Sequence, residues 1–218
     1  MQLRATVKKL PFAPTAYALM RLLRGRKARF IADYSQTSGV GSDLDATKAL
    51  VSALHSSVQA LSVRSILDIP CGDFVWMQNI DLGEITYIGA DIIETLIASH
   101  QRSHASPRRT FRTLDLVADD LPRVDLVLCR DCLVHFSHRL VKKAINNIKR
   151  SGSRYLLTTT FPRHLKNNGI VTGTWQPLNL CAPPFNFPAP LQIIDDHWTP
   201  PYEDKSLGLW NVHDLPTF

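Results

Sequence analysis

The sequence predicts an α/β protein with a doubly wound, mostly parallel sheet. Three short segments with the pattern of strands, 63–68, 85–91 and 110–114, each end at an aspartate or just before one, and helical patterns or polar turns separate them. A fourth segment, 124–129, is apolar apart from its start, as expected for a central strand that is covered on both faces. Strands that alternate with helical segments in this way indicate a parallel sheet.

The overall composition fits one globular domain. The chain has 218 residues, of which 44% are apolar and 20% are charged. It contains no run of 18 apolar residues, which argues against a transmembrane helix. The 4 cysteines of a chain this long do not suggest the disulfide framework of a small secreted protein, so we expect a cytoplasmic protein.

Positive charge is concentrated at the N-terminus. Residues 1–32 contain 8 of the 25 basic residues and no acid, which leaves 17 basic residues against 19 acids in the remainder. We expect residues 1–34 to be a helical extension with a solvated basic face, followed by one domain over residues 35–218. A mitochondrial transit peptide and a surface that binds nucleic acid are alternative interpretations of the same segment.

Two helices are predicted before the first strand. Residues 14–31 have apolar side chains at roughly helical spacing. The turn-rich segment 35–42 is either a plain linker or a lid over a ligand. Residues 43–61 predict the clearer helix, because Asp43 is a suitable N-cap. The apolar face of that helix consists of Leu50, Leu54, Val58 and Leu61.

The junction after the first strand is a candidate ligand site. The strand ends at Asp68, a short turn holds the single glycine Gly72, and Asp73 opens a segment that we expect to be an amphipathic helix. Ligands bind at such junctions, beside the carboxyl edge of a parallel sheet. The turn has neither the G-x-G-x-x-G of a dinucleotide fold nor the lysine of a P-loop. Two carboxylates would repel phosphate, so a cationic ligand suits the site better than a nicotinamide dinucleotide.

Acids also end the next two strands. Asp91 ends the second strand and is a candidate helix cap for a helix that starts near Ile93, while Asp115 follows the third strand. A carboxylate is a natural acceptor for a pair of hydroxyl groups.

The C-terminal part begins with a fifth strand at 155–161. Residues 162–190 are rich in Pro, Asn and Gly and show no helical period, which is typical of a functional loop, so we expect a substrate-binding insertion. Residues 191–194 and 207–212 then predict two closing strands, which could form a reversed hairpin at the edge of the sheet.

The segment after the fourth strand, CRDCLVHFSHR, holds the candidate catalytic residues. If it forms a helix, Asp131 and His135 lie on one face of that helix. Histidine titrates in the range that a general base needs, so His135 is our candidate base, with Asp131 orienting it or holding the substrate. The alternative is that His135 only packs or caps.

Metal or redox chemistry has less support. Cys129 and Cys132 form a C-x-x-C pair, but no second close pair completes a zinc site. His135 and His138 are 3 residues apart without a carboxylate at ligand spacing. We therefore predict no metal site.

Taken in order, five segments resemble the core of the class I S-adenosylmethionine (SAM) methyltransferases. They are ILDIPCGDFVWM, YIGADI, the acid Asp115, LVLCRDCLVHF and YLLTTTF. The D-I-P-C-G-D turn and the later run VTGTWQPLNLCAPPFNFP resemble a group of small, mostly bacterial methyltransferases. The resemblance covers about residues 35–212. It implies a Rossmann-like, seven-stranded sheet with a reversed C-terminal strand, and SAM as the cofactor.

The resemblance also implies roles for individual residues. The turn around Gly72 would pass under the methionine part of SAM, Asp91 would accept from the ribose hydroxyls, and Asp115 would lie near the adenine amine. The turn departs from the family pattern because Gly72 is its only glycine, where two or three are common. The implied cofactor-binding set is Asp68, Pro70, Cys71, Gly72, Asp73, Trp76, Asp91, Ile92, Asp115, Leu116 and Arg130.

The function that we expect is methyl transfer from SAM to an oxygen of a small polar molecule such as a sugar or a secondary metabolite. Transfer to a nitrogen is the less favoured alternative. Trp175, Asn179 and Phe185 in the long loop offer aromatic and amide surfaces for such a substrate, or they anchor the loop to the core. The alternatives are an RNA or protein methyltransferase that uses the basic N-terminal arm, and a non-catalytic binding subunit with this fold. The acceptor and the oligomeric state stay open.

Overall fold

The structure is a computed structural model that describes residues 44–196 and 198–218. The predicted helix at 14–31, the segment 35–42 and the basic extension 1–34 lie outside the described residues. The described elements are α4 (Leu44–Ala60), β1 (Ser65–Asp68), η2 (Met77–Asn79), β2 (Thr86–Asp91), α5 (Glu94–Ser103), β3 (Arg109–Thr113), β4 (Leu126–Cys129), η3 (Leu133–His135), α6 (His138–Arg150), β5 (Tyr155–Thr160), β6 (Gln192–Asp195) and β7 (Ser206–Asn211).

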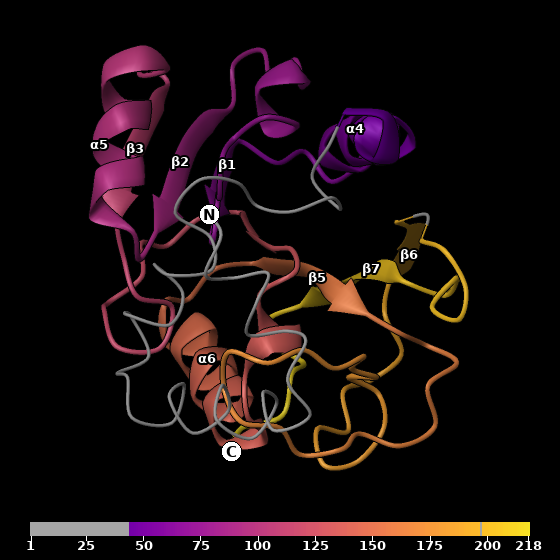
Figure 1. Ribbon diagram of the computed structural model, residues 1–218. Coiled ribbons are helices and arrows are strands. Elements are labelled where there is room, and N and C mark those ends of the chain that lie inside the picture. The colour runs from indigo at the N-terminus through magenta and orange to yellow at the C-terminus, as the bar shows by residue number, and fades with distance from the viewer. Residues whose placement is uncertain (1–43, 197) are drawn as a thin grey trace, which may run out of the picture.

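The strands form one 7-stranded sheet in the order β3-β2-β1-β4-β5-β7-β6 (Figure 1). Strands β1 to β5 pair in parallel, whereas β7 is antiparallel to both of its neighbours, β5 and β6. The predicted doubly wound sheet with a reversed C-terminal strand is therefore confirmed.

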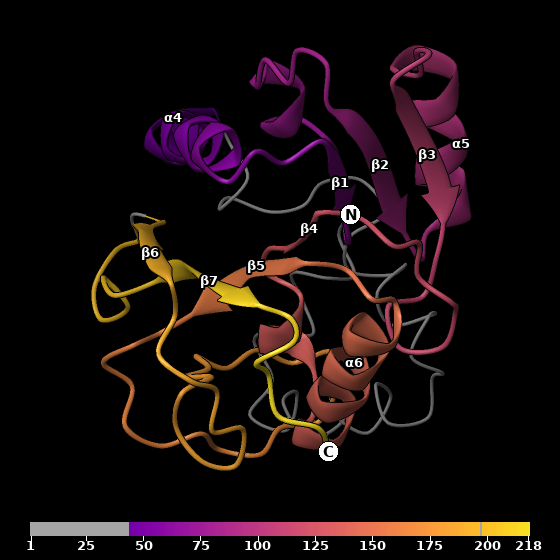
Figure 2. The ribbon, with the colours of Figure 1, turned by 180° about the vertical axis from the view of Figure 1, so that it is seen from behind.

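Helices cover both faces of the sheet, as the two opposite views show (Figures 1 and 2). Successive residues of a strand point to opposite faces. Ile66 of β1 packs in the core beneath α4 and α5, while its neighbour Leu67 packs in the core beneath α6. Because the middle of the sheet is covered on both faces, β4 is apolar throughout, as its sequence predicted, and every residue of β5 is buried.

The loop 162–190 lies beside α6 and belongs to the core on that face (Figure 1). Its residues Leu178, Leu180 and Phe185 have no exposed surface. The loop contains no helix or strand, apart from an isolated bridge between Thr172 and Thr174. Leu178, Leu180 and Phe185 thus belong to the same core cluster as the buried residues of α6.

One predicted helix does not form. Residues 73–76 after β1 form no helix, and only the short 3-10 helix η2 follows them, so the prediction of an amphipathic helix opened by Asp73 was wrong. Phe74 has a φ of 61°, a conformation that an α-helix excludes. Phe74, Trp76 and Met77 are all buried, and this spacing does not match one face of a helix.

A second predicted helix is also replaced by a turn. Asp131, the second residue after β4, has a φ of 51°, and the 3-10 helix η3 ends at His135 before α6 begins at His138. Asp131 and His135 therefore do not share a helix face, and the expectation based on helical spacing was wrong. Within the described residues, no helix is both long and apolar enough to cross a membrane.

Candidate functional site

The carboxyl edge of the sheet gathers buried charged side chains. The strands β1 and β2 end at the buried acids Asp68 and Asp91, and the residues that follow β4 and β6 are the buried Arg130 and Asp196. Two of the four described non-glycine residues with positive φ, Phe74 and Asp131, also lie at this edge. Such conformations cluster at functional sites in proteins.

Asp68 is a buried carboxyl group, and burial disfavours its ionised form. Its Oδ2 accepts a hydrogen bond of 2.6 Å from the hydroxyl of Tyr87 on β2. Burial raises the pKa of Asp68 from 3.8 to about 7, although the Tyr87 hydrogen bond and the charge of Arg130 partly oppose the shift. The side chain is therefore only partly ionised at neutral pH, and a bound cation would favour its charged form.

Asp91 is buried at the end of β2 beside Asp68. Its Oδ1 accepts a hydrogen bond of 3.0 Å from the backbone N–H of Ile93, just before α5. Burial raises its pKa, and backbone hydrogen bonds from Ile93, Gly72 and Ile92 partly offset that effect. The N-cap position itself is held by Ile93 and not by Asp91, so Asp91 supports the start of α5 from two residues upstream.

The turn between these two acids is fixed by backbone contacts. The N–H of Cys71 donates to the carbonyl of Ala90 at 2.8 Å, and the Nε2 of His100 on α5 donates to the carbonyl of Gly72 at 2.8 Å. Gly72 has a φ of 54°, in the left-handed region that favours glycine. Burial raises the pKa of the Cys71 thiol, so this cysteine is a poor nucleophile at neutral pH.

A buried ion-pair network lies next to the turn. Arg130 donates to Asp196 from Nε at 3.1 Å and from Nη2 at 2.8 Å, and its guanidinium lies 5.4 Å from the centre of the Trp76 ring. Lys205, just before β7, contacts Asp196 at 3.0 Å. Charges that are paired in this way are tolerated in a protein interior. The predicted cofactor residues Trp76 and Arg130 thus stack on each other beside the site.

Asp131 is the partly exposed member of this network. Its Oδ2 accepts a hydrogen bond of 2.7 Å from Lys205 Nζ, and 31% of its side chain is exposed. Burial acts to raise its pKa, but the charges of Lys205 and Arg130 outweigh that effect and hold the pKa of Asp131 below its ordinary value. Asp131 therefore stays ionised at neutral pH and is a weak base.

His135 is oriented by the long loop. Its Nδ1 donates to the carbonyl of Thr174 at 2.9 Å, because a carbonyl oxygen can only accept. The N–H of Gly173 donates to the His135 carbonyl at 2.8 Å, so the same loop segment holds both the ring and the backbone. In the neutral ring this arrangement puts the lone pair on Nε2, which is the atom that can accept a proton.

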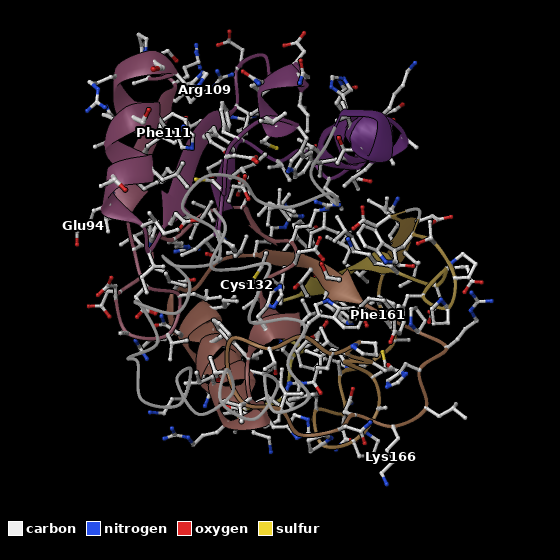
Figure 3. All side chains as sticks on the ribbon, in the orientation of Figure 1. Glu94, Arg109, Phe111, Cys132, Phe161 and Lys166 are labelled. Atoms are coloured by element: carbon white, nitrogen blue, oxygen red, sulfur yellow. The ribbon has the colours of Figure 1, made fainter. Side chains whose placement is uncertain are left out.

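Trp175 follows the residue that orients His135. It is 39% exposed, and its ring packs edge-on against Tyr202 at 4.8 Å and Phe161 at 5.8 Å. Figure 3 shows Phe161 just beyond the end of β5, so this aromatic group lies at the carboxyl edge of the sheet. These rings form an aromatic cluster that begins one residue after Thr174, whose carbonyl holds His135.

The other two predicted substrate residues lie inside the loop's own core. Phe185 is fully buried and packs edge-on against His138 at 5.2 Å. The side-chain amide of Asn179 donates to the carbonyls of Pro162 and His164 at 3.1 and 3.0 Å. Their positions favour the anchoring interpretation that the sequence left open.

The remaining predicted residues lie close to the strand ends. Asp73 accepts a hydrogen bond of 3.3 Å from the N–H of Val75, and Asp115 accepts one of 2.9 Å from the N–H of Val117. Leu116 is buried in the core beneath α6. Ile92 and Pro70 are half-buried next to Asp91 and the turn, respectively.

The sequence did not single out Tyr87, His100, Asp196 or Lys205. A usable signal existed for Lys205, because a reversed strand begins at the edge where parallel strands end, so the residue before β7 must lie at the site. In the part of the chain that the structure describes, no group of three or more His, Cys, Asp and Glu side chains is arranged to hold a metal ion.

Comparison with known proteins finds similarity only at the level of structure. No protein-family model matches the chain, and no curated protein matches it. The 1,6-didemethyltoxoflavin-N1-methyltransferase of Burkholderia thailandensis, solved with its substrate and S-adenosylhomocysteine (SAH), is 16% identical, with 91% of this chain and 89% of that chain covered and a TM-score of 0.59. The N-methyltransferase NodS of Bradyrhizobium japonicum is 13% identical over 76% of this chain and 98% of that chain, with a TM-score of 0.54. The chain therefore has the fold of these methyltransferases.

Proposed function

We propose that this protein is a SAM-dependent methyltransferase that acts on an oxygen atom of a small polar molecule. A nitrogen atom is the less favoured acceptor. The observation that carries the proposal is the pair of buried acids, Asp68 and Asp91, on either side of the Gly72 turn. The similar structure from Burkholderia thailandensis, which was solved with SAH, supports the same cofactor.

The residues at the turn fit SAM chemically. SAM carries a ribose diol and two positive groups, a sulfonium and an ammonium. Asp91 is the acceptor for the diol, and Asp68, which is only partly ionised without a cation, favours a positively charged neighbour. Asp115 at the end of the third strand is the acceptor for the adenine amine.

The chain's own part in the reaction is to align the acceptor and to take its proton. When bound, SAM supplies an electrophilic methyl group, and the protein needs to hold a nucleophile in line with it and exclude water. His135 Nε2 accepts the proton of the acceptor hydroxyl, while the Thr174 carbonyl keeps Nδ1 protonated and the ring in place. Asp131 does not serve as the base, because Lys205 keeps it ionised with a low pKa; it holds a polar group of the acceptor instead.

The first experiment is calorimetric titration of the purified protein with SAM, SAH and NAD in separate runs. We expect micromolar dissociation constants for SAM and SAH and no binding of NAD. Absence of binding by both sulfur ligands would refute the proposed cofactor and favour a non-catalytic protein with this fold.

A second experiment tests turnover with a panel of acceptors that contains phenols, sugars and amines, and it measures the SAH that is formed. Deletion of residues 1–30 is the matched control for the alternative with a macromolecular substrate. Activity on a small acceptor that survives the deletion supports the proposal, whereas activity on RNA alone that disappears with the deletion would contradict it.

A further inference from the structure

The turn between β1 and η2 lacks the extra glycines that usually shape a SAM-binding loop. Gly72 is its only glycine, and Phe74 adopts a left-handed conformation two residues later. A phenylalanine in that conformation is strained and persists only where its surroundings hold it. The turn must therefore be stabilised from outside.

A side chain of α5 provides that support. His100 is 6% exposed, and its Nε2 donates a hydrogen bond of 2.8 Å to the carbonyl of Gly72, across 28 residues of sequence. The acceptor is a carbonyl oxygen, so the proton must reside on Nε2. On the other side of the same peptide segment, the backbone N–H of Gly72 bonds to Asp91. Gly72 is thus held between a donor from α5 and an acceptor from β2.

An aromatic cluster fixes the His100 ring in this position. The ring centre lies 5.9 Å from that of Phe74, 5.3 Å from that of Phe111 and 5.7 Å from that of His104. Figure 3 shows Phe111 on the side of the sheet that α5 covers. Phe111 can lie there because Gly89 has no side chain: a Cβ at Gly89 would be 2.6 Å from Phe111 Cδ1.

We propose that His100 is the positioning residue for the cofactor turn, replacing the missing glycines by holding the Gly72 carbonyl. His100 does not touch the reacting atoms; it sets the direction of the Gly72 peptide, and through it the carboxylate of Asp91 that faces the ribose. The inference rests on the proposed function, because it assigns the turn to SAM.

Three variants of His100 separate the hydrogen bond from the packing. His100→Phe keeps a ring in the cluster but has no donor, and we expect it to weaken SAM binding about 10-fold, the usual effect of leaving a buried carbonyl unpaired. His100→Ala should weaken SAM binding at least as much. His100→Gln retains an N–H donor at similar reach and should restore the affinity to within about 3-fold of wild type. His104→Ala is the matched control, since it removes a ring from the same cluster and leaves the Gly72 bond in place.

Two readouts keep the inference separate from the proposed function. Calorimetry gives the SAM dissociation constant, and hydrogen exchange of the amides of residues 71–75 in the ligand-free protein reports how firmly the turn is held. We expect faster exchange in His100→Phe than in His104→Ala at equal melting temperature.

The outcomes are distinguishable. If wild-type protein does not bind SAM, the proposed function fails, and the assignment of the turn to SAM fails with it. If wild type binds SAM but His100→Phe binds equally well and exchanges equally slowly, the positioning role is refuted while the proposed function stands. If all four variants lose affinity in proportion to their melting temperatures, His100 is only a packing residue, which also refutes the inference.

Discussion

Substitution of Asp68 by asparagine should stabilise the protein at high pH. The amide keeps the shape of the carboxyl group and an oxygen that accepts the Tyr87 hydroxyl, but it cannot ionise. The native side chain must ionise in a buried site as pH rises, which opposes folding. The variant removes that cost.

The magnitude follows from the pKa of Asp68. At 1.36 kcal/mol per pKa unit, the difference between 3.8 and about 7 corresponds to roughly 4 kcal/mol. Between these pH values folded Asp68 holds a proton that unfolded Asp68 releases, so the stability of the wild type falls as pH rises through this window. The free energy of unfolding of Asp68→Asn, relative to wild type, should therefore increase by up to roughly 4 kcal/mol from pH 4 to pH 8.

Urea denaturation at several pH values measures this difference, with Asp120→Asn as the surface control, since the Asp120 side chain is 97% exposed. The SAM affinity of the wild type should rise with pH through about 7, as Asp68 ionises, whereas its stability falls. The SAM affinity of Asp68→Asn should stay nearly constant over the same pH range. Parallel stability curves for Asp68→Asn and wild type at all pH values would refute the argument, because they would mean that Asp68 titrates alike in the folded and unfolded states.

Three further substitutions test other parts of the structure. His135→Gln should lower turnover at least 100-fold with unchanged SAM affinity, because it removes the base but not the cofactor site; normal turnover, measured as SAH formation, would exclude His135 as the base. Asp91→Asn should weaken SAM binding at least 10-fold with an unchanged circular dichroism spectrum, and unchanged affinity in calorimetry would refute the ribose role. Gly208→Ala should lower the free energy of unfolding, measured in urea, by about 3 kcal/mol, because the new Cβ would lie 2.1 Å from Cη2 of Trp210. Gly83→Ala is the control, since no atom lies within 4 Å of a Cβ there. A smaller loss of stability in Gly208→Ala than in Gly83→Ala would contradict this packing argument.

Much of the fold could be predicted because its signals are local. Each strand from β1 to β5 lies within a few residues of its predicted position, and β4 in the centre is entirely apolar. The helix at 44–60 follows from its apolar face, in which Leu50, Leu54 and Val58 are buried. Periodicity of this kind depends only on which side of an element faces the core.

The two failed helix predictions have a common physical cause. Both segments follow a strand at the carboxyl edge, and in both a non-glycine residue, Phe74 or Asp131, adopts a left-handed conformation. Residue type gave no sign of this at Phe74, and at Asp131 it gave only a weak one, because aspartate adopts this conformation more often than most residues but still uncommonly. Phe74 is held by rings from β2, β3 and α5, and the N–H of Asp131 by Thr159 of β5 at 2.8 Å.

The positions of the acids at the site could be predicted from the sequence, but their ionisation states could not. A carboxylate at the end of a strand can be seen in the sequence, but its ionisation state is set by partners far along the chain, such as Lys205, which lies 74 residues after Asp131. The charges of Lys205 and Arg130 lower the pKa of Asp131, so this carboxylate is less suited to act as a base than its position in the sequence suggested. Asp68 differs from Asp131, since its hydrogen-bond partner is the neutral hydroxyl of Tyr87 and its pKa is raised to about 7. The difference in pKa between these two acids is thus a property of the folded sheet edge, where the reversed strand β7 brings Lys205 to one acid and β2 brings Tyr87 to the other.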